Sequence, residues 1–492
     1  MTNEPETTTV RAPIGEVRGR VDESGVRRFL GIPYAEPPLG ERRFRPPVPR
    51  APFAEVYDAA DYGPTAPQLD GSGAFGEILP NRVAPGEDYL NLNVWAPPDG
   101  SAHAVMVFIH GGGWWSGSGS VSAYDGARFA QDGVVLVTIN YRLGAEGMVW
   151  FGDGPANISL LDQICALQWV HDNIAAFGGD PEQVTVFGES SGGMSIGALL
   201  AMPAARGLFR RAIMQSGSTF HSISAGSAHK VATALARMLH VNPSLEAIGR
   251  APSEDVLAAQ RQLLAAVQRT PLKSRWGDVA RNGLPFEPIV DGASLPGRPI
   301  DAVAMGAAAE VELLVGWNAE ETRLALAPSG VDKVRWSLFW LLAIKSHVPL
   351  RVARAYRKAY SHPADAAVAM TTDWIYRIPA IRTAEAHGHS YLYEFAWRSP
   401  AFGGELGACH AAELPFVFDN LDDPGWRMLL GDAASPALAR EMHDAWIRFA
   451  RTGDPGWAPY AADARQVRRF DTKSATLDDP DRATRIPWDG VR

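Results

Sequence analysis

The hydrophobic residues of the chain are concentrated in short continuous runs, in which they do not alternate with polar residues. Runs of this kind are typical of strands buried on both faces, as in a parallel sheet covered by helices. The runs that fit are Ala104 to His110, Val134 to Asn140, Val184 to Gly188, Arg210 to Gln215, Glu312 to Gly316 and Ser390 to Phe395. We therefore predict a buried sheet built from these strands.

A helix is predicted between the second and third of these runs. Over Ser159 to Phe177 the apolar residues recur at helical spacing, and the pattern stops at Gly178 and Gly179, where a helix can end. A strand, a helix and a further strand in succession form the unit of a parallel sheet. The pattern predicts an α/β fold with a mostly parallel central sheet flanked by helices.

The N-terminal 60 residues follow a different pattern. Glu16 to Asp22 and Arg27 to Ile32 flank a turn at Ser24 and Gly25, as the strands of an antiparallel hairpin do. We expect this hairpin to form a flap at one edge of the sheet.

Two stretches interrupt the succession of strands, residues 227–268 and 331–386. The first is rich in Ala and Leu and the second in Trp and other aromatic residues, and we expect both to be helical excursions over the sheet. No long Gly/Ser linker or internal repeat separates independent modules. The sequence predicts a single domain, 1–492, with helical insertions near 227–268 and 331–386.

Composition and charge narrow the classes of partner. Hydrophobic residues make up 46% of the chain, which suits a globular protein with a large core. The 46 Lys and Arg against 55 Asp and Glu give a net charge of −9, so no global positive field would attract nucleic acid. We expect no nucleic-acid partner.

The sequence contains no signal that addresses the chain to a membrane. Its N-terminus is polar and acidic, unlike a signal peptide, and the longest apolar run, Leu338 to Ile344, is too short to span a bilayer. Only two cysteines occur, Cys165 and Cys409, which is far from a disulfide scaffold and too few for a metal site made only of thiolates. A reducing cytoplasm and no membrane partner are the expectations.

A candidate nucleophile follows the strand Val184 to Gly188. The residues GESSG, with Ser190 at the centre, lie between that strand and a helix-compatible stretch, which is the strand-turn-helix setting of a G-x-S-x-G nucleophile elbow. Because the pattern alone is weak, its context carries the argument. The alternative is that GESSG is only a strand-to-helix turn.

A second signature ends the first buried strand, at the same sheet edge as the elbow. HGGGWW, beginning at His110, contains a glycine run that lets backbone N–H groups approach an oxyanion. We assign the oxyanion donors to Gly112, Gly113 and Ser191. The alternative for the glycine run by itself is a flexible turn.

A serine hydroxyl needs an imidazole to accept its proton and a carboxylate to orient that imidazole. His410 is the candidate base, because it follows the strand Ser390 to Phe395 late in the chain, in the order Ser, acid, His of the α/β-hydrolases. Glu320 and Glu321 both follow the strand that ends at Gly316, and spacing alone does not separate them.

The motifs taken together resemble the type-B carboxylesterase family, the α/β-hydrolases that include bacterial p-nitrobenzyl-esterase-like enzymes and the cholinesterases. The resemblance covers nearly the whole chain. It rests on GIPYAEPPLGERRFRPP at 31–47, EDYLNLNVW at 87–95, HGGGWWSGS, NYRLG at 140–144, LLDQICALQWVHDNIAAFGGDP at 160–181, FGESSGG, GWNAEET and HAAELPFVF.

The resemblance implies an α/β-hydrolase fold and a role for each matching residue. By position it makes Ser190 the nucleophile, Glu321 the acid and His410 the base, with oxyanion donors at Gly112, Gly113 and Ser191. Glu189 resembles a family glutamate near the site, with a buried strut for the elbow as the alternative role.

The chain departs from the family at two of these motifs. Tyr89 stands where extracellular members place a disulfide cysteine, in keeping with an intracellular location. Ser191 replaces the common alanine after the nucleophile, and its hydroxyl is free to add a polar contact.

We therefore expect a bacterial carboxylesterase that acts through an acyl-enzyme on small to medium, apolar or aryl esters, without metal or organic cofactor, as a monomer or small homo-oligomer. Trp114, Trp115 and Met194 are candidates for the substrate pocket, although such aromatic residues also occur in cores. The alternatives are hydrolysis of carbamates, amides or thioesters by the same triad, and a non-catalytic binding protein on the same fold.

Overall fold

The computed structural model describes residues 6–69, 76 and 78–491, so the first five residues of the polar N-terminus lie outside the described residues. The predicted buried runs form the strands β6 (His103–Ile109), β7 (Val135–Ile139), β8 (Gly179–Glu189), β9 (Arg211–Gln215), β12 (Glu312–Asn318) and β13 (Ser390–Phe395). They lie side by side in the order β7-β6-β8-β9-β12-β13 and every neighbouring pair is parallel. The predicted parallel centre of the sheet is confirmed.

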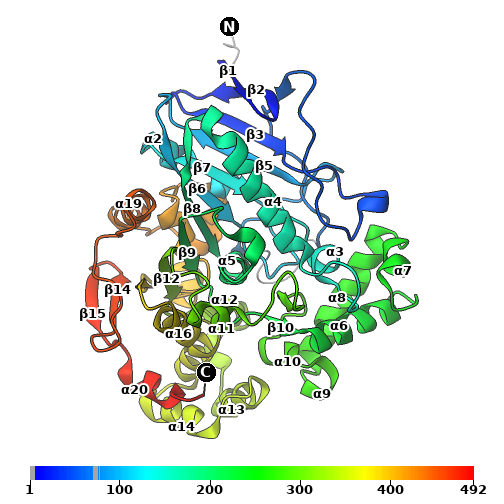
Figure 1. Cartoon of the computed structure of the whole chain (residues 1–492). Helices are drawn as coiled ribbons and strands as arrows, with labels where there is room; N and C mark the ends of the chain where they lie inside the picture. Colours follow the sequence, from blue (N-terminus) through cyan, green and yellow to red (C-terminus); the bar gives the residue numbers. More distant parts are fainter. Residues whose placement is uncertain (1–5, 70–75, 77, 492) are drawn as a thin grey trace.

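Further strands, most of them paired antiparallel, extend this centre into a 13-stranded sheet within the described residues. β2 (Gly15–Val21) and β3 (Arg27–Pro33) form the predicted hairpin, and β5 (Asn91–Ala96) joins it to β7. The hairpin lies near one edge of the sheet, where β1 is the outermost strand, and it is hydrogen-bonded into the sheet and is not a separate flap (Figure 1). The other strands are β1 (Thr7–Ala12), β4 (Tyr57–Asp58), β14 (Gln466–Phe470) and β15 (Ala475–Asp478).

Helices cover the parallel strands. The predicted helix is α4 (Ile158–Asn173), continued by η3 (Ile174–Phe177), and it ends where Gly178 adopts a positive φ of 93°. α5 (Ser191–Leu199) packs against β8 and β9, and α19 (Pro436–Thr452) packs against β6 and β8. Other short elements are α2 (Ala127–Gln131), α11 (Pro299–Ala304), α12 (Arg323–Leu326), α17 (Leu414–Val417), α18 (Arg427–Leu430), α20 (Arg482–Arg485), β10 (Ile223–Ser224) and β11 (Ile289–Val290).

Both predicted insertions are helical. The first contains α6 (Ala225–Met238), α7 (Leu245–Gly249), α8 (Ser253–Arg269), α9 (Lys273–Trp276) and α10 (Val279–Asn282). Its helices α6 and α8 pack on each other, and α8 also packs on α3 (Gly144–Met148), so this insertion lies beside the sheet at the lower right of Figure 1.

The second insertion reaches the sheet. It contains α13 (Trp336–Lys345), α14 (Leu350–Ala359), α15 (Pro363–Thr372), the π-helix η7 (Asp373–Arg377) and α16 (Ile378–His387). α16 packs against β12 and β13, as expected for an excursion over the sheet, whereas α13 and α14 form the outer corner at the bottom of Figure 1.

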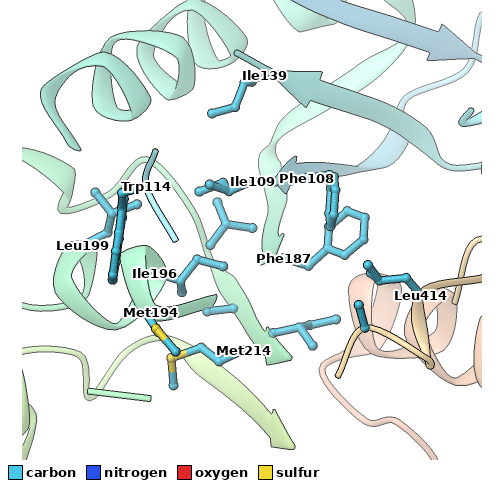
Figure 2. Packing of buried hydrophobic residues seen from close by; sticks show 14 of the residues in the cluster. Phe108, Ile109, Trp114, Ile139, Phe187, Met194, Ile196, Leu199, Met214 and Leu414 are labelled. Atoms are coloured by element: carbon cyan, nitrogen blue, oxygen red, sulfur yellow. The ribbon is translucent and has the colours of Figure 1, made fainter. Parts of the chain in front are cut away.

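The core lies directly beneath the carboxyl ends of the central strands. Phe108 of β6 contacts Phe187 of β8 with ring centroids 4.9 Å apart, and Phe418 lies 5.1 Å from Phe108. Figure 2 shows Phe108 and Phe187 next to each other, with Ile109 close by. Because these rings are fully or almost fully buried, they fix the level at which β6 and β8 end.

Candidate active site

The turn after β8 places Ser190 in a strained conformation. Ser190 has φ 55° and ψ −124°, between the last residue of β8 and the first residue of α5. A non-glycine residue in such a region costs about 1–3 kcal/mol and persists only where its surroundings hold it. Here the N–H of Ser190 donates to the Gln215 carbonyl at 2.9 Å, which ties the turn to β9.

The glycines of the GESSG motif are needed for close approach to β6. A Cβ at Gly188 would lie 2.6 Å from the Ile109 carbonyl oxygen, and a Cβ at Gly192 would lie 1.9 Å from the same atom. Both positions therefore exclude any side chain, and the strain of the turn falls on Ser190 itself.

The glycine loop after β6 lies against this turn. His110 is buried, its Nδ1–H donates to the Gly111 carbonyl at 2.7 Å, and burial lowers its pKa to about 4, so the ring is neutral. Gly112 and Gly113 have φ of 107° and 62°, which a residue with a side chain rarely adopts.

The backbone donors of this loop and of the elbow are free. Within the described residues, the N–H groups of Gly112, Gly113 and Ser191 donate to no backbone or side-chain acceptor. A Cβ at Gly111 would lie 3.2 Å from the Ser190 Cβ. The loop therefore brings unpaired N–H groups next to the serine, at the N-terminus of α5, where an anion is favoured.

The structure brings His410 together with Glu321. His410 Nδ1 lies 2.6 Å from Glu321 Oε2, and both side chains are buried. The other oxygen of Glu321 accepts the Ser216 hydroxyl at 2.6 Å and the Asn318 N–H at 2.9 Å. These bonds fix the orientation of the carboxylate and, through it, that of the imidazole.

Glu320 faces a different group of residues. Its carboxylate bonds Arg323 at 2.6 Å, Arg398 at 2.5 Å and the Ala408 N–H at 3.1 Å. Of the two adjacent glutamates that spacing left open, only Glu321 touches His410.

Glu189 occupies an unexpected place. Its Oε1 lies 3.0 Å from His410 Nε2, the nitrogen that faces the elbow. In the part of the chain that the structure describes, Ser190 Oγ makes no hydrogen bond, so His410 Nε2 is engaged by the neighbour of the serine and not by the serine itself. Glu189 therefore contacts the histidine directly.

Buried charges shift the pKa values of this cluster. Burial alone would lower the pKa of His410, but the charges of Glu189 and Glu321 outweigh burial and raise it to about 9. Burial raises the pKa of Glu189 to about 8, although the positive charge of His410 opposes the shift. The charge of each of these two groups therefore affects the protonation of the other.

Three residues that sequence reasoning did not single out support the cluster. Ser216 directly follows β9 at the same sheet edge, and its place after a predicted buried strand is a signal that the sequence contains. Glu413 is fully buried behind the histidine, where it accepts from Gln215 Nε2 at 3.0 Å and Asn318 Nδ2 at 2.6 Å, and burial raises its pKa. Tyr376, on the π-helix η7, lies over His410 with ring centroids 5.1 Å apart.

The three pocket candidates lie in different environments. Trp114 is fully buried, and its Nε1–H donates to Ser195 Oγ of α5 at 2.9 Å, which ties the glycine loop to that helix. Met194 is also buried, and Figure 2 shows it next to Met214 in the core. Trp115 is only half-buried, and its ring covers Gly113.

The described residues contain no group of three His, Cys, Asp or Glu side chains arranged to hold a metal ion.

Comparison with known proteins gives a consistent picture. Residues 6–486 match the model of the Carboxylesterase family. The chain is 38% identical to the para-nitrobenzyl esterase of Bacillus subtilis, with 96% of each chain covered, and 36% identical to the phenmedipham hydrolase of Pseudarthrobacter oxydans, with 90% of each covered. The solved structure of a thermophilic PNB esterase superposes with a TM-score of 0.85 at 35% identity, over 98% of this chain and 99% of that one.

These matches extend over almost the full length of the chain and include the sheet, the elbow and the loop that carries His410. The α/β-hydrolase fold expected from the sequence is confirmed. The chain belongs to the carboxylesterase family, and it is an enzyme that hydrolyses carboxylic esters.

Proposed function

We propose that Ser190 is the nucleophile of this esterase, His410 its general base and Glu321 the acid that orients the base. The observation that carries the proposal is the 2.6 Å contact between His410 Nδ1 and Glu321 Oε2, with Nε2 of the same ring turned toward the elbow. A carboxylate on Nδ1 keeps the proton of the neutral ring there, so that Nε2 accepts a proton from the serine in place of its contact with Glu189.

The reaction runs in two half-reactions. Ser190 Oγ attacks the ester carbonyl carbon while its proton passes to His410 Nε2, and the carbonyl oxygen becomes an alkoxide. The C–O bond to the alcohol breaks, and the alcohol leaves with the proton from Nε2. Water then attacks the acyl-enzyme by the same route and releases the acid and Ser190.

The alkoxide is stabilised by the N–H groups of Gly112, Gly113 and Ser191. The support for this assignment is that these donors have no acceptor of their own within the described residues and lie beside the serine. Donors that are already oriented before the charge develops need no reorganisation during the reaction.

The substrates are proposed to be small to medium esters with an apolar or aryl acyl group. Trp115 and Tyr376 support this, because both present an aromatic ring beside the catalytic groups and neither is fully buried. The second candidate function is hydrolysis of carbamates, amides or thioesters by the same triad. The name of the related phenmedipham hydrolase supports it.

We also propose that the protein is a bacterial cytoplasmic enzyme and a monomer or small homo-oligomer. The whole chain then forms one catalytic domain with two helical insertions. Both cysteines are free thiols, and Cys409 is fully buried next to His410 in the chain, which suits a reducing compartment.

Replacing Ser190 by Ala should lower kcat by about 10⁶-fold, because the covalent route is lost. The measurement is p-nitrophenyl acetate hydrolysis with unchanged circular dichroism, together with labelling by a fluorophosphonate probe, which should mark the wild type only. Activity retained by the variant would overturn the assignment, and an unlabelled wild type would favour a binding protein.

Replacing Glu321 by Gln should lower kcat by about 10⁴-fold, because an amide no longer holds the reactive tautomer of His410. Glu320→Gln is the matched control, since Glu320 bonds Arg323 and Arg398 and not the histidine, and its kcat should stay near the wild-type value. Equal losses in the two variants would contradict the choice of acid.

The pH profile should report the contact between Glu189 and His410. The base acts only as neutral imidazole, so a raised pKa moves the acid limb of kcat/KM to higher pH. Glu189→Gln removes an anion 3.0 Å from Nε2 and should move that limb to lower pH by about one unit. An unmoved limb would show that Glu189 does not act on the base.

An acyl panel should reveal the pocket. We expect kcat/KM to be higher for p-nitrophenyl butyrate, octanoate and benzoate than for acetate, and Trp115→Ala to reduce the benzoate rate by about tenfold relative to acetate, because an apolar contact is lost. Carbamates, anilides, thioesters and phenmedipham belong in the same assay. A preference for small charged esters would contradict an aromatic pocket.

A further inference from the structure

Residues 333–364, called here the basic segment, carry a charge opposite to that of the chain. The segment holds seven Lys and Arg and no Asp or Glu, whereas the whole chain has a net charge of −9. All seven basic side chains are exposed. They are Lys333, Arg335, Lys345, Arg351, Arg354, Arg357 and Lys358.

Carboxylates of the described residues do not pair with these cations. Among the residues that the structure describes, none of the seven forms an ion pair with a carboxylate, although ion pairs are numerous elsewhere. Arg351 donates to the Asp489 backbone carbonyl at 2.9 Å, and Arg357 lies 3.9 Å above the ring of Trp336. The positive charge of this corner therefore remains available to an external anion.

The same segment exposes a continuous apolar helix. α13 reads WSLFWLLAIK and is apolar on nearly all sides, with Ser337 and Lys345 as its polar residues, yet only Phe339 and Ala343 are buried. Leu341 is 58% exposed and Ile344 72% exposed, and Leu350 at the start of α14 is 54% exposed. A helix that is apolar all round is normally covered on every side, so this one lacks a partner on its outer side.

The position of α13 makes this face accessible. α13 packs on α14 and α15, and Figure 1 shows α13 and α14 at the outer corner, at the opposite end of the molecule from the N-terminus. No helix in the described ranges is long and apolar enough to cross a bilayer.

We propose that α13 and the first turn of α14 form a docking surface for anionic phospholipid bilayers. Leu341, Ile344 and Leu350 enter the boundary between headgroups and acyl chains, and the surrounding Lys and Arg side chains contact the lipid phosphates. An apolar face rimmed by basic residues binds anionic membranes by these two contributions together. The sequence-based expectation of no membrane partner considered only spanning and targeting segments, which this contact does not need.

The composition of the face favours lipid over other polyanions. The phosphates of nucleic acid would bind the Lys and Arg side chains, but the exposed Leu and Ile side chains cannot stack on bases. A protein partner would need its own apolar acidic surface, and this outcome is included in the test. The proposal also places the enzyme where apolar esters dissolve, but it does not depend on which residues carry out the hydrolysis.

The test is sedimentation of the full chain with vesicles of phosphatidylcholine alone, and with vesicles of equal parts phosphatidylcholine and phosphatidylglycerol, at low and high salt. Binding is expected to the anionic vesicles, to weaken as salt rises, and to be absent with neutral vesicles. Equal binding to both lipids, or no binding at low salt, would overturn the proposal.

Two variants separate the apolar and the electrostatic contributions. Leu341→Asn with Ile344→Asn should weaken the partition coefficient by at least about tenfold, while Leu272→Asn, an equally exposed leucine before α9, is the control and should leave it unchanged. Lys345→Gln with Arg354→Gln should weaken it by about thirtyfold, with Arg206→Gln and Arg261→Gln as the charge control.

All variants should keep the wild-type rate with p-nitrophenyl acetate in the absence of vesicles, because none touches the active-site residues. If the control variants lose binding as strongly as the α13 variants, the docking surface is wrong. The proposal is equally overturned if light scattering shows self-association that depends on Leu341 while vesicles are not bound.

Discussion

The candidate active site depends on one short contact, the 2.6 Å bond between His410 Nδ1 and Glu321 Oε2, which joins residues 89 positions apart in the chain. The sheet makes this bond possible, because the parallel register pairs Gly316 of β12 with Tyr393 of β13 and brings the loops that follow both strands to the same edge. Since Ser216 Oγ and the Asn318 N–H hold the other oxygen of Glu321, the carboxylate cannot rotate, and neither can the imidazole that it binds.

The same packing keeps several acidic groups in one buried cluster. Glu189, Glu321 and Glu413 are all buried near a single histidine, and three carboxylates cannot all remain ionised there. Burial raises the pKa of Glu189 and of Glu413. Glu321 contacts the imidazole and accepts hydrogen bonds from Ser216 and Asn318. The strained backbone at Ser190 destabilises the folded chain by about 1–3 kcal/mol. The hydrogen bond to Gln215 and the burial of strands β6 and β8 offset this cost.

The sequence was sufficient for the parts of the molecule that local pattern controls. The strand Ser390–Phe395 and the end of the helical stretch α4–η3 before Gly178 were predicted to the residue, because continuous apolar runs and glycine stops are local signals. The choice of Glu321 over Glu320 came only from the family resemblance, since the two differ in long-range partners. The contact of Glu189 with His410 Nε2 and the position of Tyr376 were not predictable, because one depends on a side-chain conformer and the other on a π-helix that no residue pattern indicates.

The second helical insertion connects two chemically different surfaces. Its inner end carries Tyr376 to the face of His410. α13 packs on α15, the helix directly before η7, and presents exposed basic and apolar residues to solvent. The negative net charge of the chain does not cancel this corner, because at physiological ionic strength charges are screened beyond about 8 Å, so an approaching surface responds to the local charge and not to the sum. An anionic surface would therefore meet the molecule at α13 first, with the second helical insertion between that surface and His410.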